Sequence, residues 1–330
     1  MNTAKIELHL HLDGSLNIMW AYKKALERNV ISEDTSFQDF YNILFATTEH
    51  HTAKSIRKFE ILCDLLQYRE DIYDAVYDLA RRLNDLGLIY AEIRFATQQH
   101  CLKGLSQLEA LEAARDGAIK AMEDFPIRIG IINCMMHKGD SAKFNWKENL
   151  ETIDVTEKLL GKVVVGLDLA GFENNCEYTE YAPLFEIARS KNIPYTMHSG
   201  EMGIGSHVLD AINMKANRIG HGINAIQDEK YIDALIESET PIEVCVSSNV
   251  KFDRNYVGHP VRYLIERGVK VTLNTDNMIF ARSDLVNEHN QLRMIGVSDE
   301  TLMQCTYNAL DAAFCDEETK DYIRNKLLSL

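Results

Sequence analysis

The chain has 330 residues, of which 46% are hydrophobic and 26% charged, which is enough apolar material for a sizeable core. Its formal net charge of −15 argues against a nucleic-acid partner, because such a surface repels phosphates. No apolar run of about 18 residues and no leader pattern occurs, so we expect a cytoplasmic protein without a membrane span. Seven scattered cysteines, never spaced CxxC, fit reduced thiols better than disulfides or a thiolate metal site.

Short β-branched and apolar segments alternate with helical patterns and predict eight strands. In chain order they span 5–11, 89–96, 128–136, 163–171, 194–200, 216–222, 241–248 and 270–276. Several are nearly continuous in apolar residues, as parallel strands covered on both faces require. Eight strands alternating with helices are typical of a (β/α)8 TIM barrel, an α/β fold.

The connection between the first two strands, residues 14–88, is too long for one helix and contains helical patterns at 55–67 and 71–86. An insertion of this size above a barrel strand usually covers the active-site mouth, so we predict a helical lid. The sequence pattern over 299–330 predicts two or three extra helices on the outside of the barrel. No linker or repeat divides the chain, which predicts a single domain over 1–330.

Unusual polar residues gather at the C-terminal ends of the predicted strands, where barrel enzymes build their active sites. The first strand ends in His9-Leu10-His11. Residues two apart on a strand point to the same side, so both imidazoles can face one metal ion. The later strand ends carry His198, Glu201, His221 and Asp276. Burying so many titratable groups together is costly without a metal, and three imidazoles with one carboxylate suit a catalytic Zn²⁺.

At this point the chain resembles the adenosine deaminases of the amidohydrolase superfamily, over most of its length. The matching segments are ELHLHLDGSL (7–16), GLDLAG (166–171), TMHSGE (196–201), RIGHG (218–222) and LNTD (273–276). Carried over by position, the resemblance implies that one zinc ion is bound by His9, His11, His198 and Asp276. The fold is unrelated to that of the zinc deaminases that flip nucleobases, whose His/Cys/Cys site is absent here.

The same resemblance implies roles around the metal. Glu201 would protonate purine N1, and His221 would orient or deprotonate the zinc-bound water. Gly171 would offer its backbone to the purine N3 edge, Asp13 would hold the ribose 5′-hydroxyl, and His11 would also contact substrate. The implied reaction is hydrolytic deamination of adenosine and 2′-deoxyadenosine to inosine or deoxyinosine and ammonia, with zinc-bound hydroxide attacking purine C6.

Three places depart from the family pattern, one of them Val246, where Pro is common. The family usually has a second Asp after the metal-binding one, where this chain has Asn277. An Asn carries an NH₂ donor at every pH, so we expect the contact with purine N7 to persist with altered substrate preference. The family's Gly-Asp-Glu after the fourth strand becomes Gly171-Phe172-Glu173. These differences concern specificity rather than the reaction.

Three alternatives stay open. One is a deaminase of another 6-aminopurine, such as adenine or a modified adenosine. The adenine deaminases of this family usually have Glu at the position of Asp13, so Asp13 favours a nucleoside substrate. Another is a two-metal amidohydrolase, which commonly has a Lys at the end of the fourth strand, and 163–171 contains none. The third is a non-catalytic barrel that binds nucleoside or zinc. The expected partner is a small purine nucleoside, and no obligate protein partner is inferred.

Overall fold

The computed structural model describes residues 3–45, 53–173, 177–250 and 255–329, with the backbone alone for 53–57. The strands are β1 (Ile6–His11), β2 (Tyr90–Phe95), β3 (Arg128–His137), β4 (Val164–Gly171), β5 (Thr196–Ser199), β6 (Arg218–His221), β7 (Ile242–Val244) and β8 (Val271–Leu273). They pair in parallel as two sheets, β1-β2-β3-β4 and β5-β6-β7-β8. Isolated parallel bridges join the sheets at both seams, Leu167 with Tyr195 and Leu10 with Asp276.

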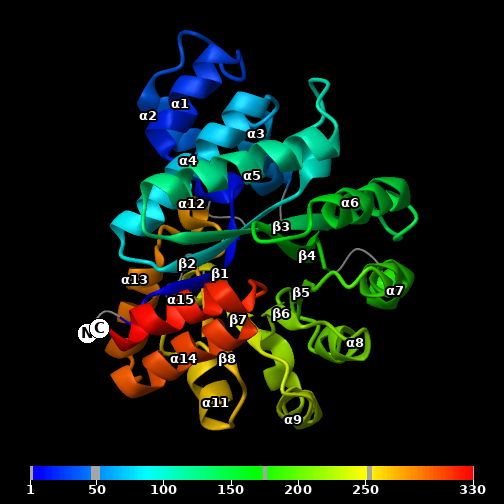
Figure 1. The fold of residues 1–330 in the computed structure, drawn as a ribbon, viewed down its shortest axis with the longest axis vertical. Coiled ribbons are helices and arrows are strands. Elements are labelled where there is room, and N and C mark those ends of the chain that lie inside the picture. Colours follow the sequence, from blue (N-terminus) through cyan, green and yellow to red (C-terminus); the bar gives the residue numbers. More distant parts are fainter. Residues whose placement is uncertain (1–2, 46–52, 174–176, 251–254, 330) are drawn as a thin grey trace.

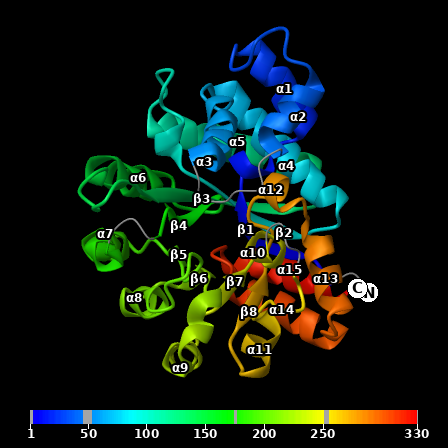
Figure 2. The same cartoon turned by 180° about the vertical axis from the view of Figure 1, so that it is seen from behind.

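The helices surround the strands in both views (Figures 1 and 2). Those of the barrel and its C-terminal end are α5 (Gln107–Asp124), α6 (Trp146–Leu159), α7 (Ala182–Ser190), α8 (His207–Asn213), α9 (Glu229–Ser238), α10 (Val246–Val250), α11 (Val261–Glu266), α12 (Met278–Ala281), α13 (Leu285–Met294), α14 (Asp299–Ala312) and α15 (Glu317–Leu328). Short 3-10 turns are η1 (Asp13–Ser15), η2 (Thr97–Gln99), η3 (Tyr178–Tyr181) and η4 (Ile223–Gln227). The predicted α/β barrel and the C-terminal helices are confirmed.

The predicted insertion between β1 and β2 is helical. It contains α1 (Ile18–Glu27), α2 (Phe37–Phe45), α3 (Ala53–Asp64) and α4 (Arg69–Asp85), and the first three of these gather at the top of Figure 1. The patterns at 55–67 and 71–86 correspond to α3 and α4. On α3, Leu62 is fully buried in the main core cluster, so this helix packs down onto the barrel. Residues 46–52 of the insertion lie outside the described part of the chain.

The seventh strand is shorter than the sequence predicts. The strand expected over 241–248 ends at Val244, and the last three of those residues begin helix α10. The backbone N–H of Ser247 donates to the carboxylate of Glu288, on α13, at 2.9 Å. A buried carboxylate at the first turn of α10 favours the helical conformation, and this tertiary contact overrides the β-propensity of the apolar run.

Two further predictions concern the chain as a whole. No helix in the described residues is both long and apolar enough to cross a membrane. The cysteines placed by the structure are all free, and Cys176 lies outside the described part. The reduced state expected from their spacing stays a prediction.

Candidate metal centre and substrate cavity

The C-terminal ends of four strands bring ionisable side chains to one point. His9, His198, His221 and Asp276 are all buried, and each offers one ligand atom within 4.8 Å of the others. His11 lies beside them, with Nε2 at 3.2 Å from Nε2 of His198 and 3.3 Å from Oδ1 of Asp276. The residues predicted from the strand ends are thus brought together in space.

The donor atoms of this cluster fit a metal ion. Nε2 of His9 is buried and has no hydrogen-bond partner within the described residues. A buried polar atom without a partner costs about 1–3 kcal/mol, a cost that a bound cation removes. Imidazole nitrogens and a carboxylate oxygen are ligands that divalent transition metals prefer. The geometry therefore indicates a metal site, as the sequence predicts.

The backbone at this cluster is held in a conformation that ordinary residues seldom adopt. His221 and Asp276 have φ angles of 63° each, in the left-handed region. Asp276 is fixed there by backbone hydrogen bonds with β1, donating to His9 at 2.8 Å and accepting from His11 at 3.0 Å. Strain of this kind costs about 1–3 kcal/mol and concentrates at functional sites.

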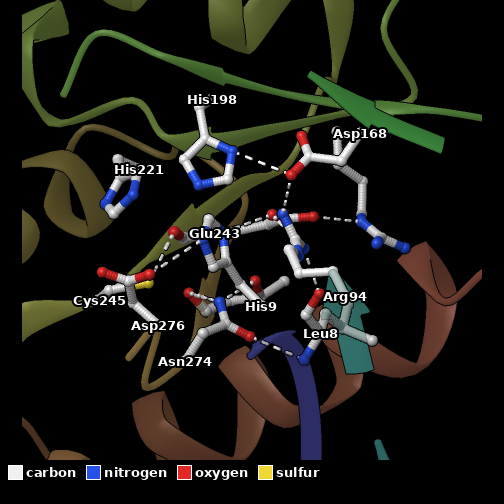
Figure 3. Close-up of polar contacts among 12 residues, drawn as sticks. Leu8, His9, Arg94, Asp168, His198, His221, Glu243, Cys245, Asn274 and Asp276 are labelled. Atoms are coloured by element: carbon white, nitrogen blue, oxygen red, sulfur yellow. Dashed lines mark hydrogen bonds and ion pairs between the residues drawn. The ribbon is translucent and has the colours of Figure 1, made fainter. Parts of the chain in front are cut away.

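Beneath the cluster, carboxylates hold the far side of two imidazoles (Figure 3). Nδ1 of His9 lies 2.8 Å from Glu243, and Nδ1 of His198 lies 3.0 Å from Asp168. Arg94 bridges these two carboxylates at 2.9 and 3.1 Å. A carboxylate that accepts the Nδ1 proton leaves Nε2 available as a ligand. These contacts therefore orient the imidazoles toward the metal site.

The charged network extends away from the site through Arg218, which contacts Glu243 at 2.6 Å and Glu92 at 2.5 Å. All of these side chains are fully buried. Burial alone would raise the pKa of Glu243, but Arg94 and Arg218 outweigh it and hold that pKa well below its usual range. The sequence analysis missed this network. It could have been detected from Glu92 and Arg94, because these two charged residues lie two apart, on one face of a strand that the sequence predicts to be buried.

A cavity of about 660 Å³ opens over the metal site. Its wall includes the predicted residues His11, Asp13, Gly171, His198, Glu201, His221, Asp276 and Asn277. Phe59 and Cys63 of the insertion line it too, so the predicted lid contributes to the cavity wall. Asp13 is 2% exposed, and burial raises its pKa to about 6. Its Oδ2 lies 3.6 Å from the Cys63 sulfur.

Two candidate proton-transfer groups face each other in this cavity. The carboxylate of Glu201, on the loop after β5, lies 3.7 Å from Nε2 of His221. Burial lowers the pKa of His221 to about 4, so its imidazole is neutral at pH 7. The sequence analysis missed two supporting residues on α10: Asn249 lies 3.1 Å from Nδ1 of His221, and Ser248 donates to Asp276 at 2.6 Å.

Comparison with known proteins identifies the family. A model of the family "Adenosine deaminase" matches residues 4–330. The chain belongs to the adenosine deaminase family. An adenosine deaminase of Haemophilus ducreyi is 35% identical, across 96% of this chain and 93% of its own length. The resemblance found in the sequence is thereby confirmed.

Solved structures share the fold of this adenosine deaminase family member. An adenine deaminase of Arthrobacter aurescens has a TM-score of 0.85 at 21% identity, covering 98% of this chain and 99% of its own. A Burkholderia ambifaria amidohydrolase with bound Zn has a TM-score of 0.85 at 19% identity, covering 99% of this chain and 94% of its own. At these identities the likeness shows the architecture.

Two predicted residues of the cavity wall have distinctive surroundings. Gly171 ends β4 with a φ of 116°, and a Cβ there would lie 2.6 Å from the carbonyl oxygen of His137, so only glycine fits. Asn277 donates to Oδ1 of Asp276 at 2.6 Å, and its own Oδ1 has no hydrogen-bond partner among the described residues. The amide therefore lies against a candidate metal ligand as well as the cavity.

Proposed function

We propose that this protein hydrolytically deaminates adenosine to inosine and ammonia, and acts on 2′-deoxyadenosine in the same way. The observation that carries the proposal is one cavity, in a member of the adenosine deaminase family, that contains both a His/Asp metal cluster and Glu201. Curated relatives named adenosine deaminase support adenosine as the substrate.

We assign zinc to the cluster, and the residues that would hold it are His9, His11, His198 and Asp276. Their imidazole and carboxylate donors are those of catalytic zinc sites, and the structurally similar Burkholderia amidohydrolase was solved with bound Zn. When bound, zinc supplies a hydroxide nucleophile near neutral pH. The buried carboxylates behind His9 and His198 would keep their Nε2 atoms directed at the ion.

The reaction needs proton transfer on both sides of the attacked carbon. Glu201 would donate a proton to purine N1, which draws electron density away from C6 and makes it electrophilic. His221, neutral and 3.7 Å from Glu201, would orient the attacking water and accept its proton at Nε2. The proton accepted by His221 would then pass to the amino group at C6, and the C6–N bond would break to release ammonia. The proton left on the C6 oxygen would return to Glu201, so both groups regain their starting states. General acid–base groups of this kind contribute about 10²–10⁴-fold each.

The cavity favours a nucleoside. Gly171 and Asp13 both line the cavity, where Gly171 would offer its backbone to the purine N3 edge and Asp13 would hold the 5′-hydroxyl of a ribose. About 660 Å³ lies within the range of small-molecule sites and accommodates a sugar as well as a base. A neutral substrate also suits a wall that carries several carboxylates.

The proposal is tested by ammonia release from adenosine, 2′-deoxyadenosine and adenine, with metal content measured for each sample. We expect the two nucleosides to be preferred and Glu201→Gln to lose at least about 100-fold in kcat while keeping its metal. The control is Glu237→Gln, an exposed glutamate on α9 that should behave as wild type. Near-normal turnover by Glu201→Gln would remove this residue from the role, and a preference for adenine would contradict the nucleoside assignment.

A further inference from the structure

The loop that carries Glu201 is held by a carboxylate from the neighbouring strand end. Glu173, which follows β4, accepts hydrogen bonds from three successive backbone N–H groups: Gly200 at 2.5 Å, and Glu201 and Met202 at 2.9 Å each. Three donors on one carboxylate fix the direction of three peptide planes. The Cα–Cβ bond of Glu201 is therefore set by Glu173.

The carbonyl side of the same loop is held from the other direction. Asn224, in η4 after β6, donates its side-chain amide to the carbonyl oxygens of Gly200 and Glu201, both at 2.9 Å. Gly200 itself has a φ of 66°, and a Cβ there would lie 2.8 Å from a methyl of Val208. The loop is thus clamped between its two neighbours and has little freedom to reposition Glu201.

Glu173 is itself rigidly supported. It is 2% exposed, and its Oε1 lies 2.8 Å from Nδ1 of His207. The ring of Tyr178 stacks on His207 with centroids 4.8 Å apart and planes inclined by 10°. Burial alone would raise the pKa of Glu173, but His207 and the backbone donors outweigh it and lower that pKa. The group is therefore a charged acceptor, whose hydrogen bonds are stronger than those of a neutral one.

We propose that Glu173 is a positioning residue for Glu201, setting where the Glu201 carboxyl meets the purine ring. The proposal rests on the proposed function, because it assumes that Glu201 transfers the proton. Glu201 and Met202 line the cavity, whereas Glu173 is not among the described residues that do so. Glu173 would therefore act through the loop backbone and not by touching substrate.

The expected effect follows from the geometry. In Glu173→Gln, one carboxylate oxygen becomes an NH₂ donor that faces backbone N–H donors, so the loop has to shift. A displacement of about 1 Å in a catalytic group costs about 100-fold in rate. We expect kcat to fall about 10- to 100-fold. The KM for adenosine should change less than about 3-fold and the metal content should not change, since no predicted ligand or ribose contact is altered.

A double-mutant cycle tests whether the effect passes through Glu201. We compare Glu173→Gln in the wild-type and Glu201→Gln backgrounds, measuring kcat and metal content. The substitution should cost about 10- to 100-fold in the first background and less than about 3-fold in the second, because residues that act as a unit are non-additive. Equal costs in both backgrounds would overturn the proposal.

Glu180→Gln is the matched control. Glu180 also accepts from a backbone N–H and a side chain of a neighbouring loop, at Ala142 and Ser141, but it is exposed and does not hold the Glu201 loop. Its kcat should equal that of wild type, and a loss like that of Glu173→Gln would count against a specific role.

If Glu173→Gln does not fold or loses its metal, the proposal is tested with Glu173→Asp. This substitution keeps the negative charge but shortens the side chain by one methylene. A kcat loss of about 10-fold, with metal and unfolding midpoint retained, supports the proposal; wild-type kcat overturns it. Failure of the proposed function has a different signature, which is near-normal turnover by Glu201→Gln alone.

Discussion

The two sheets of the barrel differ in ways that match their contributions to the site. Strands β1 to β4 have six to ten residues, whereas β5 to β8 have three or four. The long strands place charged side chains such as Glu92, Arg94 and Asp168 deep in the barrel, where they are fully buried. The short strands end early, but they too bury charged side chains, namely Arg218 and Glu243.

Backbone conformation at the strand ends differs in one respect. Glycines with positive φ angles follow or end strands of both halves, Gly139 and Gly171 on the long strands and Gly200 and Gly222 on the short ones. Left-handed φ angles at non-glycine residues of the strand ends occur at His221 and Asp276, both on the short-strand half. Apart from His9 and His11 on β1, the predicted metal and proton-transfer groups lie on this second half. The comparison teaches that both halves of the barrel supply the buried charges beneath the site, with Arg218 and Glu243 coming from the short strands. The short-strand half also supplies most of the predicted reactive groups and holds two of them in left-handed backbone conformations.

The largest expected effect comes from removing a buried charge. Arg94→Met would remove the cation that bridges Asp168 and Glu243 at 3.1 and 2.9 Å; Glu243 would keep Arg218 at 2.6 Å, whereas Asp168 would lose the arginine with which it pairs. Uncompensated buried charge costs about 3–5 kcal/mol, so we expect the free energy of unfolding to fall by that amount. Because the two carboxylates hold His198 and His9, metal affinity should fall about 10- to 100-fold. Chelator competition and chemical denaturation measure the two effects separately.

The matched control removes a solvent-accessible arginine from the insertion. Arg81 pairs with Asp78 and Asp85 on α4, at 2.8 and 2.9 Å, and is 40% exposed at its side chain. Arg81→Met should change the free energy of unfolding by no more than about 1 kcal/mol and leave metal affinity intact. A stability loss as large as that of Arg94→Met would show that burial of the network is not what makes it important.

A smaller effect is expected from the strained half of the barrel. Gly222→Ala and Gly104→Ala both force alanine into the left-handed region, at φ angles of 69° and 102°. A Cβ at Gly222 would lie 2.7 Å from a methyl of Ile242, whereas a Cβ at Gly104 would have nothing within 4 Å. Denaturation should therefore show Gly222→Ala about 1–3 kcal/mol less stable than Gly104→Ala. Equal losses would mean that the backbone conformation, and not the packing behind His221, sets the cost.

Sequence reasoning was most successful where periodicity and position agree. Buried parallel strands are continuously apolar, so polar residues such as His9, His198 and Asp276 stand out at their ends. The roles assigned to these residues, and the single domain over 1–330, stay predictions. The helix α10 was missed because its first residues continue an apolar, β-branched run. Its conformation depends on Glu288, some forty residues later in the chain, which no local pattern reveals.

The supporting contacts were harder to predict than the ligands for a related reason. Glu173 follows β4, where it keeps the Glu of the family's Gly-Asp-Glu, and Asn224 is a polar loop residue after β6. The sequence does not show what either side chain contacts. Their importance comes from lying on either side of the loop after β5, which depends on the order of strands in the closed barrel. A strand-end motif identifies which side chains face the site, whereas the groups that hold them are identified by three-dimensional contacts.

The smallest expected effect concerns Asn277, on the strained half, where an Asp is usual in the family. If its amide donates to purine N7, Asn277→Ala should lower kcat/KM for adenosine up to about 10-fold, the value of one hydrogen bond. It should leave kcat/KM for 7-deazaadenosine almost unchanged, because that analogue has no acceptor there. In the structure the same amide donates to Asp276 at 2.6 Å, so it can also act through the metal site. If kcat/KM falls equally for both substrates and the metal content falls too, Asn277 supports the metal ligand Asp276 and does not recognise the purine.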